Sequence, residues 1–83
     1  MVRVKSVKPE DGYRLWVEFE DGAEGTIDLL ADLWGPVFEP LKEVGFFRQV
    51  FIDEYGVICW PNGADLAPEV VHAEVVAASA GVR

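Results

Sequence analysis

A long hairpin pattern, YRLWVEFEDGAEGTIDL, constrains the fold most, because its register can be worked out from the sequence. Apolar and polar residues alternate along its first half, as in a strand that is buried on one face. A two-residue turn would set Leu15 opposite Asp28 and put charge on the buried face, whereas a three-residue loop sets Leu15 opposite Ile27. A slip of one residue moves every side chain to the other face. The sequence therefore predicts the loop Glu20-Asp21-Gly22, with its glycine in the left-handed conformation of a bulged turn.

The outer face of the same hairpin carries a tryptophan among charged residues. Trp16 shares this face with Arg14 and Glu18, and the register places Thr26 and Glu24 beside it on the next strand. Tryptophan and arginine often anchor protein interfaces, and acidic neighbours favour a basic partner. We therefore predict Trp16 as an anchor, with Glu18 and Glu24 as its acidic rim. The alternative is that a loop or the last helix covers Trp16, because aromatic side chains usually find cover.

Further strand and helix patterns lie on either side of this hairpin. VRVKSV alternates like a half-buried strand, and QVFIDEYGVICWP has the pattern of a second hairpin with a loop at residues 54–56. That loop would pair Ile52 with Ile58 and Phe51 with Cys59, and apolar residues on both faces favour central strands covered on two sides. PEVVHAEVVAAS predicts a helix over residues 68–79. Its expected core stripe is Val70, Val71, Ala73, Val75, Ala77 and Ala78, and its expected outer residues are Glu69, His72 and Ser79.

The segment between the hairpins holds too many Pro and Gly residues for one helix. Asp28 can cap a short turn over residues 29–33, and Pro40 can begin a second short helix that ends near Gly45. The apolar residues of this segment are expected to form a flap over the sheet: Leu33, Trp34, Val37, Phe38, Leu41, Phe46 and Phe47. The whole pattern predicts a single small α+β domain over residues 1–83, with its core at 2–79 and a frayed C-terminus. A mostly antiparallel sheet of about five strands, short helices and a C-terminal helix are expected.

Charge and cysteine content limit the partners. Fifteen acidic against seven basic residues leave a formal net charge of −8, so we expect neither direct nucleic-acid binding nor membrane binding. A protein partner, such as a small basic protein, is compatible with this charge, and a homodimer would help so small a domain to bury surface. Cys59 is the only cysteine, and the N-terminus lacks the apolar run of a signal peptide. A cytoplasmic location is therefore expected.

Residues that could carry chemistry are few. No serine or threonine lies on a strand-to-helix elbow, no glycine-rich phosphate loop occurs, and Cys59 lies in an apolar strand that would keep its thiol protonated. We therefore expect no enzyme activity and no cofactor. A metal site built from Asn62, Asp65, Glu69 and His72 is disfavoured by the single histidine, and a Cys59–His72 pair is disfavoured by the buried setting of the thiol. The alternative function is a small-ligand or enzymatic pocket between the flap and the sheet, near Asn62, Asp65 and His72.

The string CWPNGADLAPE forms the joint between the second hairpin and the last helix. Pro61 ends the strand, an Asn-Gly pair turns the chain, and Pro68 begins the helix. This joint lacks an obvious helix cap, because Ala67 has no side-chain acceptor and Pro68 has no N–H to offer Asp65. A local rule broken without visible compensation can mark a functional position. Asn62 and Asp65 therefore join the candidate partner-binding residues, the alternative being that they only form the joint.

Several strings together resemble a known family. They are VKP, YRLWVEFEDG, IDL, VFEPLK, FFRQVFID and, most specifically, CWPNGADLAPE. Over roughly residues 2 to 75, judged by the order of these motifs, the chain resembles the small bacterial domains catalogued as domain of unknown function 2442. The resemblance implies a small α+β domain built on antiparallel strands, without assigned catalytic residues.

Two kinds of protein are found in that family. Some members are similar to the front half of proteins that end in a helix-turn-helix DNA-binding domain, and others stand alone beside a second small gene, as toxin–antitoxin pairs do. Because the sequence ends at Arg83, we expect no helix-turn-helix in this chain. The resemblance therefore implies the stand-alone form, a non-catalytic protein-binding or regulatory module that is antitoxin-like.

Overall fold

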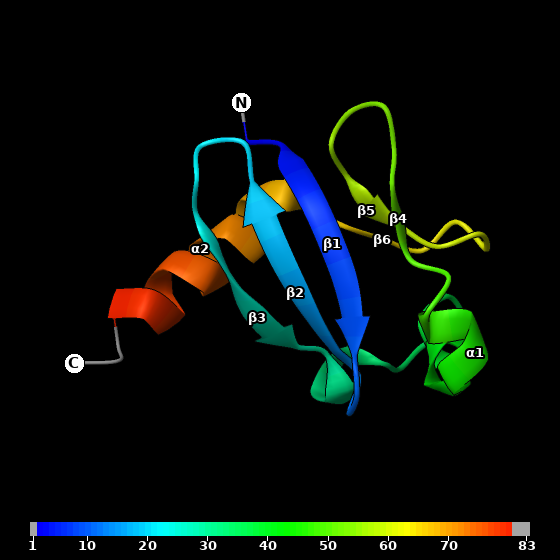
Figure 1. Cartoon of the computed structure of the whole chain (residues 1–83). Helices are drawn as coiled ribbons and strands as arrows, with labels where there is room; N and C mark the ends of the chain where they lie inside the picture. Colours follow the sequence, from blue (N-terminus) through cyan, green and yellow to red (C-terminus); the bar gives the residue numbers. More distant parts are fainter. Residues whose placement is uncertain (1, 81–83) are drawn as a thin grey trace.

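The predicted first hairpin forms two strands of the larger sheet in the computed structural model, which describes residues 2–80 and the side chains of residues 2–78 (Figure 1). This sheet has the order β1 (Val4–Glu10), β2 (Arg14–Phe19) and β3 (Glu24–Asp28), all antiparallel. Leu15 pairs with Ile27, and Gly22 has a φ of 93°. Both the register and the left-handed glycine are therefore confirmed.

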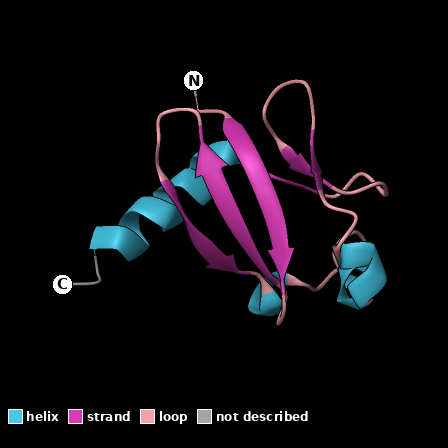
Figure 2. Cartoon of the chain, in the orientation of Figure 1, coloured by secondary structure: helices cyan, strands magenta, loops and turns pink. Residues whose placement is uncertain are grey.

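The second hairpin forms a small sheet of its own, so the predicted sheet of about five strands is wrong. Its strands β4 (Phe51–Ile52), β5 (Ile58–Cys59) and β6 (Asp65–Leu66) have the order β4-β5-β6. Figure 2 shows short strands of this hairpin beside the larger sheet. The predicted pairs of Phe51 with Cys59 and Ile52 with Ile58 are confirmed. Phe51 is 44% exposed, however, so this hairpin is not covered on both sides. The backbone N–H of Val4 donates to the carbonyl of Gly56, a turn residue, so the two sheets touch at this point while their ladders stay separate.

Three hairpin loops share one geometry. Each ends in a glycine with positive φ, namely Gly22, Gly56 and Gly63. In each case the N–H of the residue just before the loop donates to the carbonyl of the residue just after the glycine, as Trp60 N donates to Ala64 O. Glycine meets this requirement because it reaches positive φ without steric cost. The third loop turns the chain from β5 into β6, a strand that the sequence analysis did not anticipate.

The segment between the sheets forms three short helical turns. They are the 3-10 helices η1 (Leu30–Asp32) and η2 (Glu39–Lys42) and the helix α1 (Val44–Phe47). The carboxylate of Asp28 accepts the N–H of Leu30, the first residue of η1, but the N-cap position is Leu29, and η1 is shorter than the turn predicted over residues 29–33. The helix that contains Pro40 ends at Lys42, and Gly45 lies inside α1 instead of ending a helix. Glu43 explains this change, because its carboxylate accepts the N–H of Phe46 and starts a new helix.

Only part of the predicted flap is buried. Leu33, Leu41 and Phe47 belong to the core, and Phe38 and Phe46 pack against it. Trp34 is 72% exposed and Val37 is 45% exposed, so these two residues do not cover the sheet.

Helix α2 (Pro68–Ala80) confirms the predicted C-terminal helix and packs against β3. Its buried stripe is narrower than predicted: Val71 and Val75 are buried, whereas Val70 is 57% exposed. Ala73, Ala77 and Ala78 are exposed as well, and His72 is half-buried instead of lying outside. The buried stripe is narrow because α2 packs mainly against a single strand, β3. Two residues spaced i, i+4, Val71 and Val75, are enough to face that strand. The expectations for Ser79 and for residues 81–83 lie outside the described side chains and residues.

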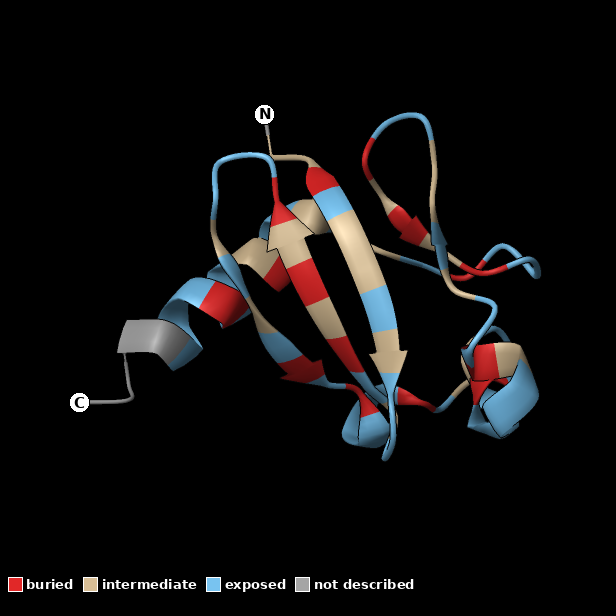
Figure 3. Ribbon diagram, viewed as in Figure 1, coloured by how far each residue is buried: buried red, intermediate tan, exposed pale blue. Residues whose placement is uncertain are grey.

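One core joins both sheets. It contains Leu15, Val17 and Phe19 of β2 together with Ile58 and Trp60, and the buried residues of β2 alternate with partly buried ones (Figure 3). Trp60 donates its indole N–H to the carbonyl of Phe47 at 2.9 Å. No helix in residues 2–80 has the length and apolar character needed to cross a membrane.

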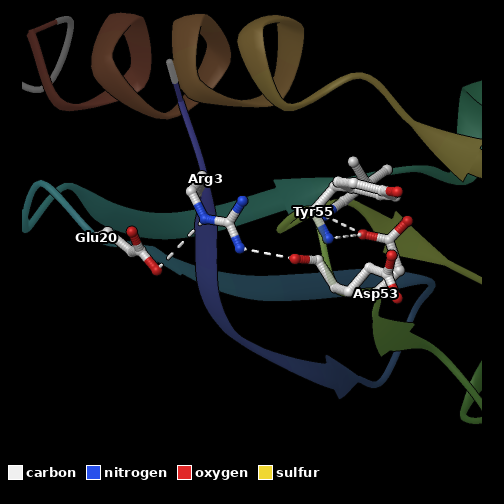
Figure 4. A network of polar contacts seen from close by, with 6 residues as sticks. Arg3, Glu20, Asp53 and Tyr55 are labelled. Atoms are coloured by element: carbon white, nitrogen blue, oxygen red, sulfur yellow. Dashed lines mark hydrogen bonds and ion pairs between the residues drawn. The ribbon is translucent and has the colours of Figure 1, made fainter.

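A polar network closes the edge between the sheets. Arg3 donates to the carbonyl of Glu54 at 2.8 Å and lies 3.7 Å from the carboxylate of Glu20 (Figure 4). Asp53 accepts the backbone N–H groups of Tyr55 and Val57. One arginine thus links the first hairpin to the turn of the second.

Candidate interaction surface

Trp16 lies at the centre of the outer face of the larger sheet. It belongs to the middle strand, opposite Lys8 of β1 and Thr26 of β3. Helix α2 lies behind the sheet and covers its other face (Figure 1). Trp16 is therefore half-buried by its strand neighbours, and α2 does not cover it.

Charged side chains surround Trp16. The ammonium nitrogen of Lys8 lies 5.5 Å from the centre of a Trp16 ring, a distance at which a cation and an aromatic face attract each other. Glu18 is 3.9 Å from Lys5, so one predicted rim residue has a basic neighbour. The outer face is accordingly mixed in charge, with basic residues on β1 and acidic ones toward β3.

The two predicted rim residues stand directly opposite each other. Glu18 of β2 pairs in register with Glu24 of β3. Like charges at opposed positions of a sheet destabilise it, and Lys5 offsets only the charge on Glu18. A paired acid site that costs stability is the kind of feature that a binding surface retains.

Asn62 lies in the turn between β5 and β6, and Asp65 lies on β6, so neither belongs to the larger sheet that carries Trp16. The Asn62 side chain accepts the N–H of Ala64 at 3.1 Å and donates to the carbonyl of Val37 at 2.9 Å. Both bonds shape the loop, so Asn62 holds the β5–β6 turn against the flap. Asp65 of β6 pairs with Cys59 of β5, and the exposed Asp65 side chain lines a pocket.

This pocket lies between β3, η1, β6 and α2 and has a volume of about 270 Å³. Most of its wall is apolar, and three exposed acids, Asp32, Asp65 and Glu74, stand along it. The full lining comprises Ile27, Leu29, Asp32, Leu33, Phe38, Asp65, Leu66, Ala67, Val70, Val71 and Glu74. Of the alternative site that the sequence suggested, Asp65 lines this pocket, whereas Asn62 and His72 do not.

His72 has a different partner. Its Nε2 atom lies 2.8 Å from Oδ2 of Asp21, and its ring meets Phe19 edge-to-face at 4.8 Å. The backbone N–H of Ala23 and, next, the His72 side chain lower the pKa of Asp21. His72 therefore fastens α2 to the β2–β3 loop. Within residues 2–80 no group of three histidine, cysteine or acidic side chains is arranged to hold a metal ion.

The hydrogen-bond partners of Cys59 do not include His72. Burial, and then the nearby Asp53 carboxylate, raise the pKa of its thiol. The Cys59 thiol donates to Val57 O at 3.4 Å and lies 3.7 Å from Asp53 Oδ2. A protonated thiol is a poor nucleophile.

The sequence suggested a pocket near Asp65 but not the walls of this one. They combine two distant parts of the chain, β3 with η1 and β6 with α2, and β6 was not predicted. One signal was present: Asn-Gly between two short apolar runs is a hairpin pattern, and it would have placed Asp65 on a strand.

A comparison with protein families supports the resemblance seen in the motifs. The family model described as "Protein of unknown function (DUF2442)" matches residues 4–77, which include every described strand and most of α2. No curated protein and no solved structure shows significant similarity to the chain. The family match spans most of the sequence, and the chain therefore belongs to the DUF2442 family of proteins of unknown function.

Proposed function

We propose that this protein is a non-catalytic protein-binding module, a regulatory component of the antitoxin-like kind, which recognises a small basic protein. The observation that carries the proposal is Trp16, which lies at the centre of a sheet face that α2 leaves open. A large, half-buried aromatic side chain within a polar rim is typical of an interface anchor.

Charge supports a basic partner. The net charge of −8 attracts a basic protein over long distances, and the opposed Glu18 and Glu24 concentrate negative charge near Trp16. A basic side chain placed between these carboxylates would relieve their repulsion. In this proposal, binding of the basic partner therefore also stabilises the strand pair that carries Glu18 and Glu24.

The distribution of reactive groups favours binding over catalysis. Cys59 carries a raised pKa, and His72 contacts Asp21 and Phe19 instead of a nucleophile. A nucleophile acts in catalysis when an adjacent base or a lowered pKa activates it. The carboxylate beside the Cys59 thiol, that of Asp53, raises the pKa of this thiol instead of lowering it.

The test is a tagged pull-down from the native host, with mass spectrometry of the co-purified proteins. The wild type should recover a recurrent small basic protein, and Trp16→Ala should lose it while remaining folded. Trp34→Ala is the matched control, because it removes a 72% exposed tryptophan from another part of the surface. This control should keep the partner.

Light scattering separates a foreign partner from a second copy of the chain. If the Trp16 face seals a homodimer, Trp16→Ala should yield a monomer and Trp34→Ala should not. A folded Trp16→Ala variant that keeps both its partner and its self-association would refute the role of this face.

A further inference from the structure

We infer that the pocket between β3, η1, β6 and α2, called here the acid-rimmed groove, binds a short protein segment that carries a large apolar side chain flanked by lysine or arginine. The groove does not depend on the proposed Trp16 interface. Ile27, which lines it, points to the face of the larger sheet opposite Trp16, because Ile27 pairs with buried Leu15.

The wall of the groove is suited to apolar side chains. Leu29, Leu33 and Val71 form a buried floor, and Phe38 and Leu66 are only partly covered. Val70 leaves 57% of its surface exposed at this wall, although it lies on the first turn of a helix whose neighbouring Val71 is buried. Exposed apolar surface next to a concave apolar floor favours ligand binding, because a ligand that covers it removes apolar area from water.

The volume limits the occupant. About 270 Å³ lies just under the roughly 300 Å³ at which pockets for drug-sized ligands begin. A whole nucleotide cofactor would bury little of its surface there. One or two large side chains of a docked segment fit this volume better.

The charge of the groove determines which residues should flank the apolar side chain of the bound segment. Asp32 of η1, Asp65 of β6 and Glu74 of α2 come from three sides of the groove, and none of the described basic residues lines it. Within the described part of the chain none of these carboxylates forms an ion pair or accepts a hydrogen bond from a side chain. Three acids around an apolar floor complement lysine or arginine residues on either side of an apolar anchor.

The experiment uses the full chain and three capped pentapeptide probes. The basic apolar probe is Lys-Leu-Lys-Leu-Lys, its charge control is Lys-Ser-Lys-Ser-Lys, and its apolar control is Glu-Leu-Glu-Leu-Glu. Amide chemical shifts in NMR titrations should saturate with the first probe alone. They should map to Leu66, Ala67, Val70 and Val71, and not to Trp16.

Matched variants on α2 test the groove itself. Glu74→Lys should raise the dissociation constant of the basic apolar probe about threefold, and Val70→Lys about tenfold, because it also removes apolar wall. Glu69→Lys and Val76→Lys make the same substitutions at exposed α2 positions outside the groove. These controls should change the dissociation constant of the basic apolar probe by less than about twofold.

Several results would overturn the inference. If the serine probe binds as tightly as the basic apolar probe, binding is only nonspecific electrostatic attraction. If the glutamate probe binds as tightly, the groove is a purely apolar ligand pocket. Shifts centred on Trp16, or no saturable shifts, would also refute it. Trp16→Ala should bind the probe like the wild type, so failure of the groove and failure of the Trp16 interface can be told apart.

Discussion

At the residue scale, two glycines of the hairpin loops allow the cost of backbone strain to be measured apart from the cost of steric crowding. Gly22 and Gly56 both have positive φ, but a Cβ atom at Gly22 would meet nothing within 4 Å. At Gly56 it would lie 2.8 Å from Arg3 Cβ and 3.1 Å from Arg3 Cα. We expect Gly22→Ala to lower the free energy of unfolding by about 1 kcal/mol, from strain alone.

Gly56→Ala should cost more than Gly22→Ala, because the Arg3 backbone at the sheet junction must move to admit the new methyl group. Urea unfolding of both variants measures the difference. Equal losses would contradict the close approach of Gly56 to Arg3.

A second residue-scale prediction concerns the Asp21–His72 contact. The pKa of Asp21 is lowered by the N–H of Ala23 and then by His72, and the pKa of Asp53 is lowered chiefly by the N–H of Val57. Because the folded-state pKa of Asp21 is depressed, its contribution to stability is present above its unfolded pKa and is lost as pH falls through the folded value.

His72→Ala should therefore raise the pKa of Asp21 and reduce the pH dependence of stability in the acid range. The pKa of Asp53 should stay unchanged and serves as the internal control. Carboxyl NMR titration measures both groups. An unchanged Asp21 pKa in this variant would show that the backbone bond alone depresses it.

At the element scale, α2 stabilises the protein through a narrow stripe. Val75 is 3% exposed and lies over Gly25, where an added Cβ would approach a Val75 methyl group to 3.2 Å. Val75→Ala should cost about 2 kcal/mol, the value of two buried methyl groups with the cavity they leave. Val76→Ala, at a 47% exposed position on the same helix, should change stability by less than about 0.5 kcal/mol. Thermal unfolding compares the two, and similar losses would contradict the assigned stripe.

The elements that could be predicted from the sequence are those that local rules determine. The β2–β3 register followed from the alternation around Leu15 and from one loop glycine, and the start of α2 followed from Pro68. The division into two sheets could not be predicted, because local patterns do not determine which distant strands pair, and residues 4–28 and 51–66 form separate ladders. For a similar reason the sequence suggested a pocket near Asp65 but not its walls, which meet only in the folded chain.

At the scale of the whole molecule, the proposed absence of catalysis has a direct test. Thermal shifts with divalent metals and common nucleotides should be flat. A ligand at a hundred times its dissociation constant would stabilise the fold by about 2.7 kcal/mol, which for a domain of this size raises the melting temperature by about 10 °C or more. A zinc-dependent shift that disappears in His72→Ala would contradict the non-catalytic proposal.

The two sheets should also unfold together, although their backbones do not form one ladder. Val17 of the larger sheet and Ile58 of the smaller one are each fully buried in the same core, and Trp60 adds its bond to Phe47. Within residues 2–80 neither sheet has a second apolar core on which to remain folded, and domains of this size usually unfold in one cooperative step. In a urea titration followed by NMR, the native amide signals of Val17 and Ile58 and the indole signal of Trp60 should therefore disappear with one midpoint. Loss of the Ile58 and Trp60 signals at a lower urea concentration than that of Val17 would mean that the larger sheet and α2 fold without the smaller sheet, and that the shared core does not couple them.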